Sequence, residues 1–133
     1  MKRRHTMPFG CELLPAGGAR FRLWAPAARE VAVRLHGSGD LRAMPAGAGW
    51  FELERPDARA GDRYHFVIDG RHVVPDPVSR WNPDDVHGAS AIVDPLAFDW
   101  QDADWKGRPW HELVLYELHV GTFTPEGTFA GVE

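Results

Sequence analysis

The side chains most suited to chemistry lie close to the end of the sequence, in "LVLYELHVGTFTPEGTFAGVE". Glu117 and His119 stand near the end of an apolar run, and Glu126 follows in a turn-like stretch. Carboxylates and histidines are the usual general acids and bases of enzymes. We nevertheless interpret Glu117 as a polar contact at the side of a strand and Glu126, in "TPEG", as a turn residue. No catalytic residue is predicted in this chain.

Metal and cofactor sites are not predicted either. The seven histidines show no His-x-x-x-His spacing beside a carboxylate, the spacing of a common type of zinc site. The stretches "GSGD" and "GAGW" lack the strand, glycine-rich loop and helix that together bind phosphate. We therefore expect neither a zinc site nor a phosphate-binding loop. Because the net charge is −4 and the basic residues are scattered, a neutral or polar small-molecule partner fits better than a nucleic acid.

The element that carries Glu117 and His119 is the segment Leu113 to Val120, with apolar residues at six of its eight positions. This pattern is typical of a strand that is covered on both faces, as in a parallel sheet. A parallel neighbour needs a crossover of about a dozen or more residues. The 13 residues after Val120 contain no second strand. We therefore expect the chain to be a truncated piece of a longer protein.

Upstream of this segment, apolar and polar residues alternate in short stretches. Four of these stretches are "ARFRLW", "EVAVRLH", "WFELE" and "DRYHFVI", the last followed by the hairpin signal Asp69-Gly70. About six such strands, separated by glycine and proline turns, predict a mainly β fold, an antiparallel immunoglobulin-like β-sandwich. We assign residues 1–96 to this sandwich, 97–112 to a linker and 113–133 to the start of a further domain.

Composition narrows the functional classes. A chain of 133 residues holds one ordinary domain but not a barrel enzyme of about 250 residues. The net charge is −4 and the basic residues are scattered, so no nucleic-acid partner is predicted. No run of about 18 apolar residues occurs, so no membrane span is expected. The single cysteine, Cys11, excludes an intrachain disulfide and favours a cytoplasmic location.

Four stretches of the sequence resemble a known enzyme family. They are "FRLWAPAAREVAVRL", "GDRYHFVIDG", "VPDPVSRWNPDDVHGASAIVD" and "LYELHVGTFTPEGTFAGVE". In this order and spacing they resemble the N-terminal part of the maltooligosyltrehalose trehalohydrolases, members of the α-amylase family of glycoside hydrolases. The resemblance extends over residues 5–133, and "YELHVGTFTPEGTF" is its most specific element. Related branching and debranching enzymes share a Tyr-Glu-x-His strand but usually continue differently.

The resemblance implies an E-set sandwich, like that of glycogen-binding modules, followed by a (β/α)8 catalytic barrel. Leu113 to Val120 would be the first barrel strand, and Thr128 would cap the first barrel helix. The family's catalytic carboxylates follow later barrel strands, so they would lie beyond residue 133 and this chain would be inactive without the remainder of its barrel. The complete enzyme would release trehalose from maltooligosyl-trehalose, or act on a related α-glucan, and would need no cofactor.

Other classes stay open at this point. One alternative is the N-terminal sandwich of a glycogen branching or debranching enzyme. Another is a free-standing carbohydrate-binding module, and a third is a structural or interaction domain. The apolar segment after Trp110 has no use in the last two, because neither requires a barrel strand.

Two residues are candidates for substrate contact. His119 would lie at the catalytic end of the barrel strand and line the sugar site; the alternative is a hydrogen-bonded structural histidine. Trp81, in the loop-like "SRWNPDD", is predicted to be exposed and to contact carbohydrate or a neighbouring domain. Trp24, beside a proline turn, and Trp50, at a strand start, are interpreted as packing residues.

Overall fold

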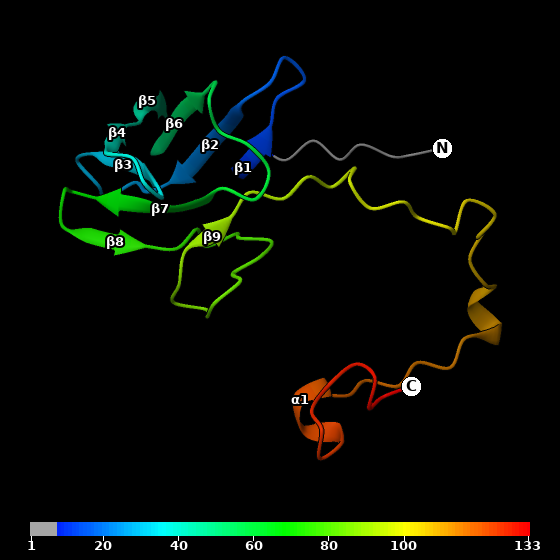
Figure 1. The fold of residues 1–133 in the computed structure, drawn as a ribbon. Coiled ribbons are helices and arrows are strands. Elements are labelled where there is room, and N and C mark those ends of the chain that lie inside the picture. Colours follow the sequence, from blue (N-terminus) through cyan, green and yellow to red (C-terminus); the bar gives the residue numbers. More distant parts are fainter. Residues whose placement is uncertain (1–7) are drawn as a thin grey trace. The chain divides into compact units, whose positions relative to one another are not determined.

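The computed structural model of the chain describes residues 8–133. These residues belong to two compact units, of which the first ends at Asp99 and the second comprises Trp100–Glu133. The first unit contains all the strands assigned in the described part of the chain, and the second contains two short helices (Figure 1). Within residues 8–133, no helix has the length and hydropathy to cross a membrane.

Nine strands of the described residues pair into two antiparallel sheets. Sheet A has the order β1-β2-β6-β5, and sheet B has the order β4-β3-β7-β8, with β9 also paired to β7. The strands are β1 (Gly10–Leu13), β2 (Ala19–Trp24), β3 (Val31–Leu35), β4 (Asp40–Arg42), β5 (Met44–Gly47), β6 (Trp50–Arg55), β7 (Arg63–Ile68), β8 (His72–Val74) and β9 (Ser90–Ala91). This arrangement confirms the antiparallel sandwich predicted from the sequence.

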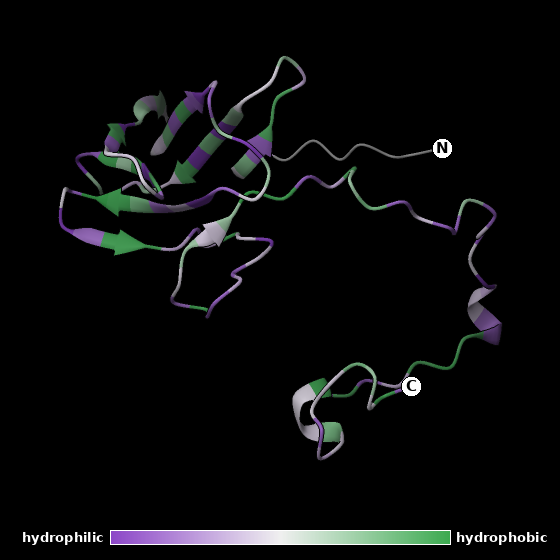
Figure 2. Ribbon diagram, in the orientation of Figure 1, coloured by the Kyte–Doolittle hydropathy of each residue, from purple (hydrophilic) through white to green (hydrophobic). Residues whose placement is uncertain are grey.

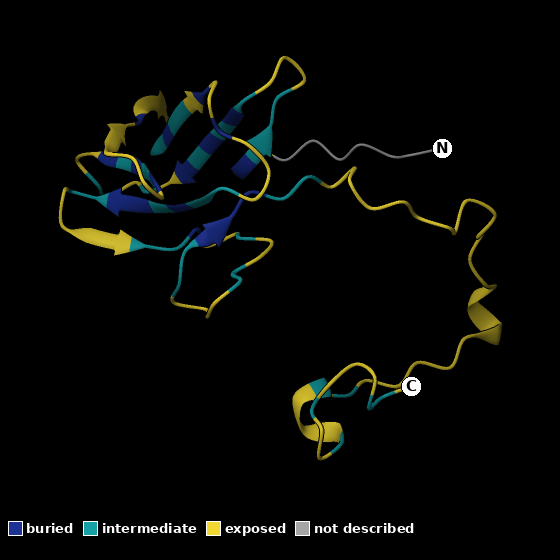
Figure 3. Cartoon of the chain, viewed as in Figure 1, coloured by how far each residue is buried: buried dark blue, intermediate teal, exposed yellow. Residues whose placement is uncertain are grey.

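The core lies between the two sheets and follows from the period of two in the strands. Phe21 of β2 and Val33 of β3 have no exposed surface, whereas the residues next to them are half-buried. Phe21 packs edge to face against Tyr64 of β7, with ring centroids 4.9 Å apart. Figures 2 and 3 show the matching alternation of hydropathy and burial along the strands. Burial of these large apolar side chains holds the sheets together.

The hairpin between β7 and β8 confirms the signal read from Asp69-Gly70. Both residues have positive φ, 51° at Asp69 and 64° at Gly70, as the central residues of a type I′ turn do, and the Arg71 N–H donates to the Ile68 carbonyl across the turn at 3.0 Å. The Asp69 carboxylate accepts hydrogen bonds from the backbone N–H groups of Arg29 (2.8 Å) and Glu30 (3.1 Å). These bonds lower the pKa of Asp69 and attach the turn to the chain just before β3.

The second unit differs from the sequence prediction. It contains a 3-10 helix η1 (Trp110–Glu112) and the one-turn helix α1 (Val120–Phe123). The strand predicted over Leu113 to Val120 is not formed, and Val120 instead begins α1. A strand requires a neighbour for its backbone hydrogen bonds, and no described segment pairs with residues 113–119. Assignment of this segment to a barrel therefore stays a prediction.

Thr128 makes the side-chain hydrogen bond expected of a capping residue. Its Oγ1 accepts from the backbone N–H of Gly131 at 3.2 Å, which is the contact an N-cap makes with the third residue of a helix. Residues 130–132 form turns rather than a helix. The local capping geometry is therefore present, whereas the predicted helix is not.

Candidate functional site

Trp81 lies in the irregular segment 75–89 between β8 and β9. Its side chain is 54% exposed, as the sequence predicts. The backbone around it is fixed, because its carbonyl accepts from the N–H of Ala91 in β9 at 2.8 Å and from the hydroxyl of Ser79 at 3.1 Å. Trp81 thus presents an indole from an ordered loop. Its contact with carbohydrate stays a prediction.

The start of this loop is fixed by the buried carboxylate of Asp76, which is 4% exposed. The Tyr64 hydroxyl donates to Asp76 Oδ2 at 2.5 Å, and the Val78 N–H donates to Asp76 Oδ1 at 2.9 Å. The Asp76 N–H in turn donates to Ser90 Oγ at 2.9 Å. Burial raises the pKa of Asp76 and, more strongly, that of Tyr64. A satisfied buried network of this kind fixes one conformation of the chain.

Gly10 allows the loop to approach β1. An added Cβ there would lie 2.7 Å from Val78 Cγ2 and 3.2 Å from Asp76 Oδ2, and the φ of Gly10 is +75°. A residue with a side chain would be strained by this φ and would clash with the loop. Glycine at this position is therefore required by both the backbone and the space.

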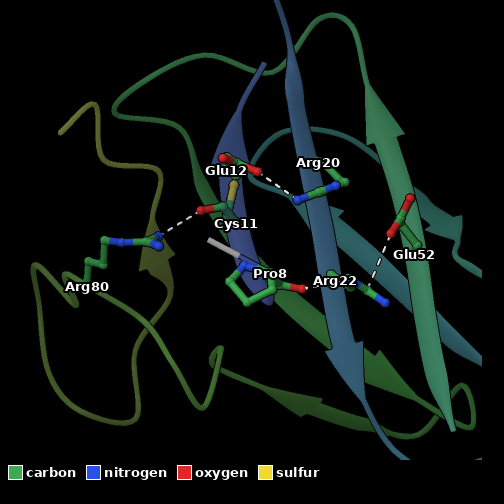
Figure 4. Close-up of polar contacts among 7 residues, drawn as sticks. All are labelled: Pro8, Cys11, Glu12, Arg20, Arg22, Glu52 and Arg80. Carbon is green, nitrogen blue, oxygen red and sulfur yellow. Dashed lines mark hydrogen bonds and ion pairs between the residues drawn. The ribbon is translucent and has the colours of Figure 1, made fainter. Parts of the chain in front are cut away.

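Arg80 and Arg63 attach the remainder of the loop. Arg80 Nη1 donates to the carbonyl oxygen of Cys11 at 2.7 Å, a contact drawn in Figure 4. Arg63 of β7 forms an ion pair with Asp84. Burial, reinforced by the nearby Asp76, raises the pKa of the Cys11 thiol to about 12. The thiol is therefore protonated at neutral pH, and Cys11 is a buried apolar residue rather than a nucleophile.

A pocket of about 370 Å³ lies beside β1 and is also lined by Arg80. Its walls include Leu13, Leu14 and Val93, together with Arg59. Its volume is at the lower end of the range of about 300–1,000 Å³ for small-molecule sites. Trp81 is not among its lining residues, so the structure does not combine the predicted tryptophan with this pocket.

His119 lies in the second unit, directly before α1, with an exposed side chain. Its carbonyl oxygen accepts from the N–H groups of Thr122 and Phe123, both at 3.0 Å. Its imidazole makes no capping hydrogen bond. The backbone of His119 therefore has a structural role, and sugar contact by its side chain stays a prediction. Glu117 and Glu126 are exposed as well.

Among the described residues, no group of three or more histidine, cysteine or acidic side chains is placed so that it could hold a metal ion.

The outer face of sheet A carries a cluster that the sequence interpretation missed. Arg22 of β2 is its centre: Nη1 donates to the Pro8 carbonyl at 3.0 Å, and Nε lies 3.4 Å from Glu52 Oε2 (Figure 4). The guanidinium carbon lies 4.8 Å from the centroid of the Trp50 ring, which also stacks on Phe9 at 6.4 Å. Beside this cluster, Arg20 of β2 forms an ion pair of 2.7 Å with Glu12.

Trp24 corrects one interpretation. We interpreted it as a domain-packing residue, and its side chain is 58% exposed, so no described residue of this chain buries it. The alternation of β2 explains this, because Trp24 has the same parity as Arg20 and Arg22, which point away from the core. Its indole Nε1–H donates to the Ala48 carbonyl at 3.1 Å, which fixes the orientation of the ring. The parity of "RFRLW" was the signal that would have revealed it.

Fold and surface together define an immunoglobulin-like β-sandwich with ordered tryptophans exposed on a sheet face and on a loop. The sequence matches the family described as carbohydrate-binding module 48 (isoamylase N-terminal domain) over residues 8–97. The chain belongs to this family.

Named proteins with similar sequences are much longer than this chain. A malto-oligosyltrehalose trehalohydrolase of Deinococcus radiodurans is 51% identical over 121 residues, which is 90% of this chain and 20% of that protein. One of Saccharolobus solfataricus is 42% identical over 126 residues, 95% of this chain and 22% of that protein. The chain thus spans about a fifth of the length of these relatives.

A solved structure is similar as well. It is a crystal structure from Salmonella typhimurium described as an alpha amylase, with a TM-score of 0.86 and 44% identity. The match includes 94% of this chain and 21% of that one. Similarity therefore extends past the sandwich into the second unit.

Proposed function

We propose that this chain is the N-terminal part of a glycoside hydrolase of the α-amylase family. The complete enzyme would hydrolyse the α-1,4 bond next to the terminal trehalose unit of maltooligosyl-trehalose and release trehalose. The observation that carries the proposal is the 51% identity to the trehalohydrolase of Deinococcus radiodurans. This identity extends over 121 residues, more than the 99 residues of the first unit, so it includes residues of the second unit.

In this proposal the chain contributes binding and positioning rather than bond cleavage. A retaining glycosidase requires two carboxyl groups about 5 Å apart on a rigid frame. Glu117 and Glu126 are exposed in a unit with little regular structure, so they do not meet this requirement. The nucleophile and the acid are therefore assigned to the catalytic barrel, and the α-glucan is the ligand class assigned to the sandwich.

A chimera tests the proposal directly. The matching N-terminal segment of the Deinococcus radiodurans enzyme is replaced by residues 1–133, and trehalose release from maltotriosyl-trehalose is measured. We expect a rate within about tenfold of the parent enzyme, because the barrel would meet a closely similar domain surface. A matched control chimera carries the N-terminal module of a pullulanase instead, and it should be at least about tenfold slower.

Equal rates for the two chimeras would contradict the proposal, because any sandwich of this family would then serve. The 133-residue chain is assayed in parallel and should release no trehalose above the blank. Turnover by the chain alone would contradict the assignment of the chemistry to a separate barrel.

A further inference from the structure

We propose that the outer face of sheet A binds a linear α-1,4-glucan, with Trp24 as the stacking surface and the Arg22–Glu52 pair as the partner of the sugar hydroxyls. The site uses residues of β2 and β6 that are register neighbours, Arg22 opposite Glu52 and Trp24 opposite Trp50. The inference deepens the proposed function, because it rests on α-glucan as the ligand class. It assigns that ligand to a face distinct from the Trp81 loop and from the pocket beside β1.

Trp24 has the properties of a stacking surface for a pyranose ring. The indole is 58% exposed, and its polar edge is already satisfied by the Ala48 carbonyl at 3.1 Å. What remains for a ligand is the apolar ring. Gly49 provides the room, because an added Cβ there would lie 3.2 Å from Trp24 Nε1 and 2.8 Å from Pro26 Cβ. Tryptophan combines a large apolar face with little conformational freedom, which suits the C–H face of a sugar.

Trp50 supports this surface but does not supply it. Its ring is in contact with two neighbours, the guanidinium of Arg22 at 4.8 Å and the Phe9 ring at 6.4 Å with an interplanar angle of 19°. Cross-strand neighbours on one sheet face lie about 5 Å apart at Cβ, so the packed Trp50 lies directly beside Trp24. The cluster around Arg22 therefore forms a rigid border next to the exposed indole.

Charge distinguishes a sugar from a protein as the occupant of this face. Charged residues line the face in register: Glu12, Arg20 and Glu54 in one row, and Arg22 and Glu52 in the next. Glutamate, of which this face carries three, is depleted in protein–protein interfaces. A polyhydroxylated ligand, by contrast, donates to carboxylates and accepts from guanidinium groups through charge-assisted hydrogen bonds. The Glu52 side chain is 33% exposed and makes an ion-pair contact with Arg22 at 3.4 Å, so its oxygens are accessible to hydroxyl groups.

Preorganisation favours this face over the Trp81 loop. Trp24 is the last residue of β2 and pairs with Trp50 of β6, and its ring is fixed by a hydrogen bond. Trp81 stands on the irregular loop 75–89; its backbone is hydrogen-bonded, but among the described residues no hydrogen bond fixes its indole ring. A surface already held in its binding geometry loses less entropy when the ligand binds. Stronger glucan contact is therefore expected at Trp24.

The test is a titration of the 133-residue chain with maltoheptaose, followed by calorimetry and by the indole N–H resonances in ¹H–¹⁵N spectra. We expect the Trp24 resonance to shift. Trp24→Ala should weaken binding by about tenfold or more, and Trp24→Phe, which keeps a ring, by clearly less. Glu52→Gln should weaken binding by a few fold. Trp110→Ala, which removes an indole that is 77% exposed in the second unit, is the matched control and should leave the affinity unchanged.

Several results would overturn the inference. One is unchanged affinity of folded Trp24→Ala, with folding checked by its thermal transition. Another is loss of binding in Trp81→Ala but not in Trp24→Ala, which would place the ligand on the loop. A change in sedimentation of Trp24→Ala without any glucan-dependent shift in the parent would identify a protein interface instead. Absence of maltoheptaose binding by the unaltered chain would overturn this inference and the assignment of α-glucan to the sandwich. It would leave the proposed enzyme class standing, because trehalose release by the chimera does not depend on it.

Discussion

The two units differ in what happens to their apolar side chains. In the sandwich, Phe21 and Tyr64 lose almost all of their exposed surface against the facing sheet. In the second unit, Val114, Leu115 and Tyr116 form an equally apolar run but are 93%, 76% and 75% exposed. The strands that carry Phe21 and Tyr64 and the run at residues 114–116 all have sequences typical of strands. The difference shows that an apolar pattern yields a strand only where a neighbouring strand and a facing layer exist.

The largest expected effect is on the free energy of unfolding when one phenylalanine is removed from each unit in turn. Phe21→Ala empties a fully buried position and should lower the free energy of unfolding by about 3–5 kcal/mol. Phe129→Ala, at a side chain that is 79% exposed in the second unit, should change it by less than about 0.5 kcal/mol. Urea unfolding followed by circular dichroism measures both. Similar losses in the two variants would show that the second unit is packed as tightly as the sandwich.

A smaller effect is expected from the buried network. Asp76→Asn keeps the shape of the side chain but disturbs the hydrogen bonds from Tyr64 and Val78, at a cost of about 1–3 kcal/mol. Burial raises the pKa of Asp76 above its ordinary value of 3.8. The contribution of this group to stability is therefore fully present below pH 3.8 and is lost as the pH rises through the raised value.

The penalty of Asp76→Asn should accordingly be larger at acid pH than at pH 7. The measurement is the difference between the unfolding free energies of the two proteins across this pH range. Taking the difference removes the opposite contribution of carboxylates such as Asp57, whose pKa is lowered to about 2 by the Arg55 guanidinium. A difference that does not vary with pH would show that Asp76 titrates alike in the folded and unfolded states.

Alanine substitution at two glycines distinguishes the effect of backbone strain on stability from the effect of a steric clash. Gly10 and Gly17 both have positive φ, +75° and +94°, but a Cβ would clash only at Gly10, since Gly17 has no neighbour within 4 Å. Gly17→Ala should cost about 1 kcal/mol from strain alone. Gly10→Ala should cost more, because it also displaces Val78 and the Asp76 carboxylate. The measurement is the thermal transition temperature of each variant. Equal temperatures would mean that the loop at Asp76 and Val78 moves away from an added Cβ at residue 10 without cost.

The smallest effect on stability, with a clear effect on association, is expected in the second unit. The exposed apolar run at residues 114–116 should promote concentration-dependent association, because contact between copies removes these side chains from water. Leu115→Lys should keep the chain monomeric while changing the unfolding free energy by less than about 0.5 kcal/mol. Val86→Lys, at an exposed valine in the loop of the sandwich, is the control and should not alter association. Sedimentation at several protein concentrations measures the association state. An unaltered chain that stays monomeric at all of them would refute the prediction.

Local pattern was sufficient to predict much of the sandwich. The alternation in "ARFRLW" and "DRYHFVI" correctly indicated the buried faces, and Asp69-Gly70 correctly indicated the hairpin. The short strands β4 and β5 have every residue exposed, and β5 contains Pro45, so they carry no alternation that sequence analysis could detect.

The candidate site was less accessible to such reasoning. Exposure of Trp81 followed from its prolines and aspartates, but the clamp from Arg80 to the Cys11 carbonyl joins residues 69 positions apart and leaves no local trace. The cluster around Arg22 depends in the same way on the register between β2 and β6. Trp24 was interpreted from the proline turn beside it, whereas its exposure in this chain follows from its parity on β2.

The lone thiol of Cys11 makes the chain its own reporter of local opening. The side chain is enclosed beside β1, at the place where Arg80 holds the loop, and it is 5% exposed. A thiol reagent can modify it only when β1 or the loop opens, so labelling rates would time these openings without an added probe. Comparison of such rates with the global unfolding rate would show whether the first strand separates from the sandwich as an independent folding unit.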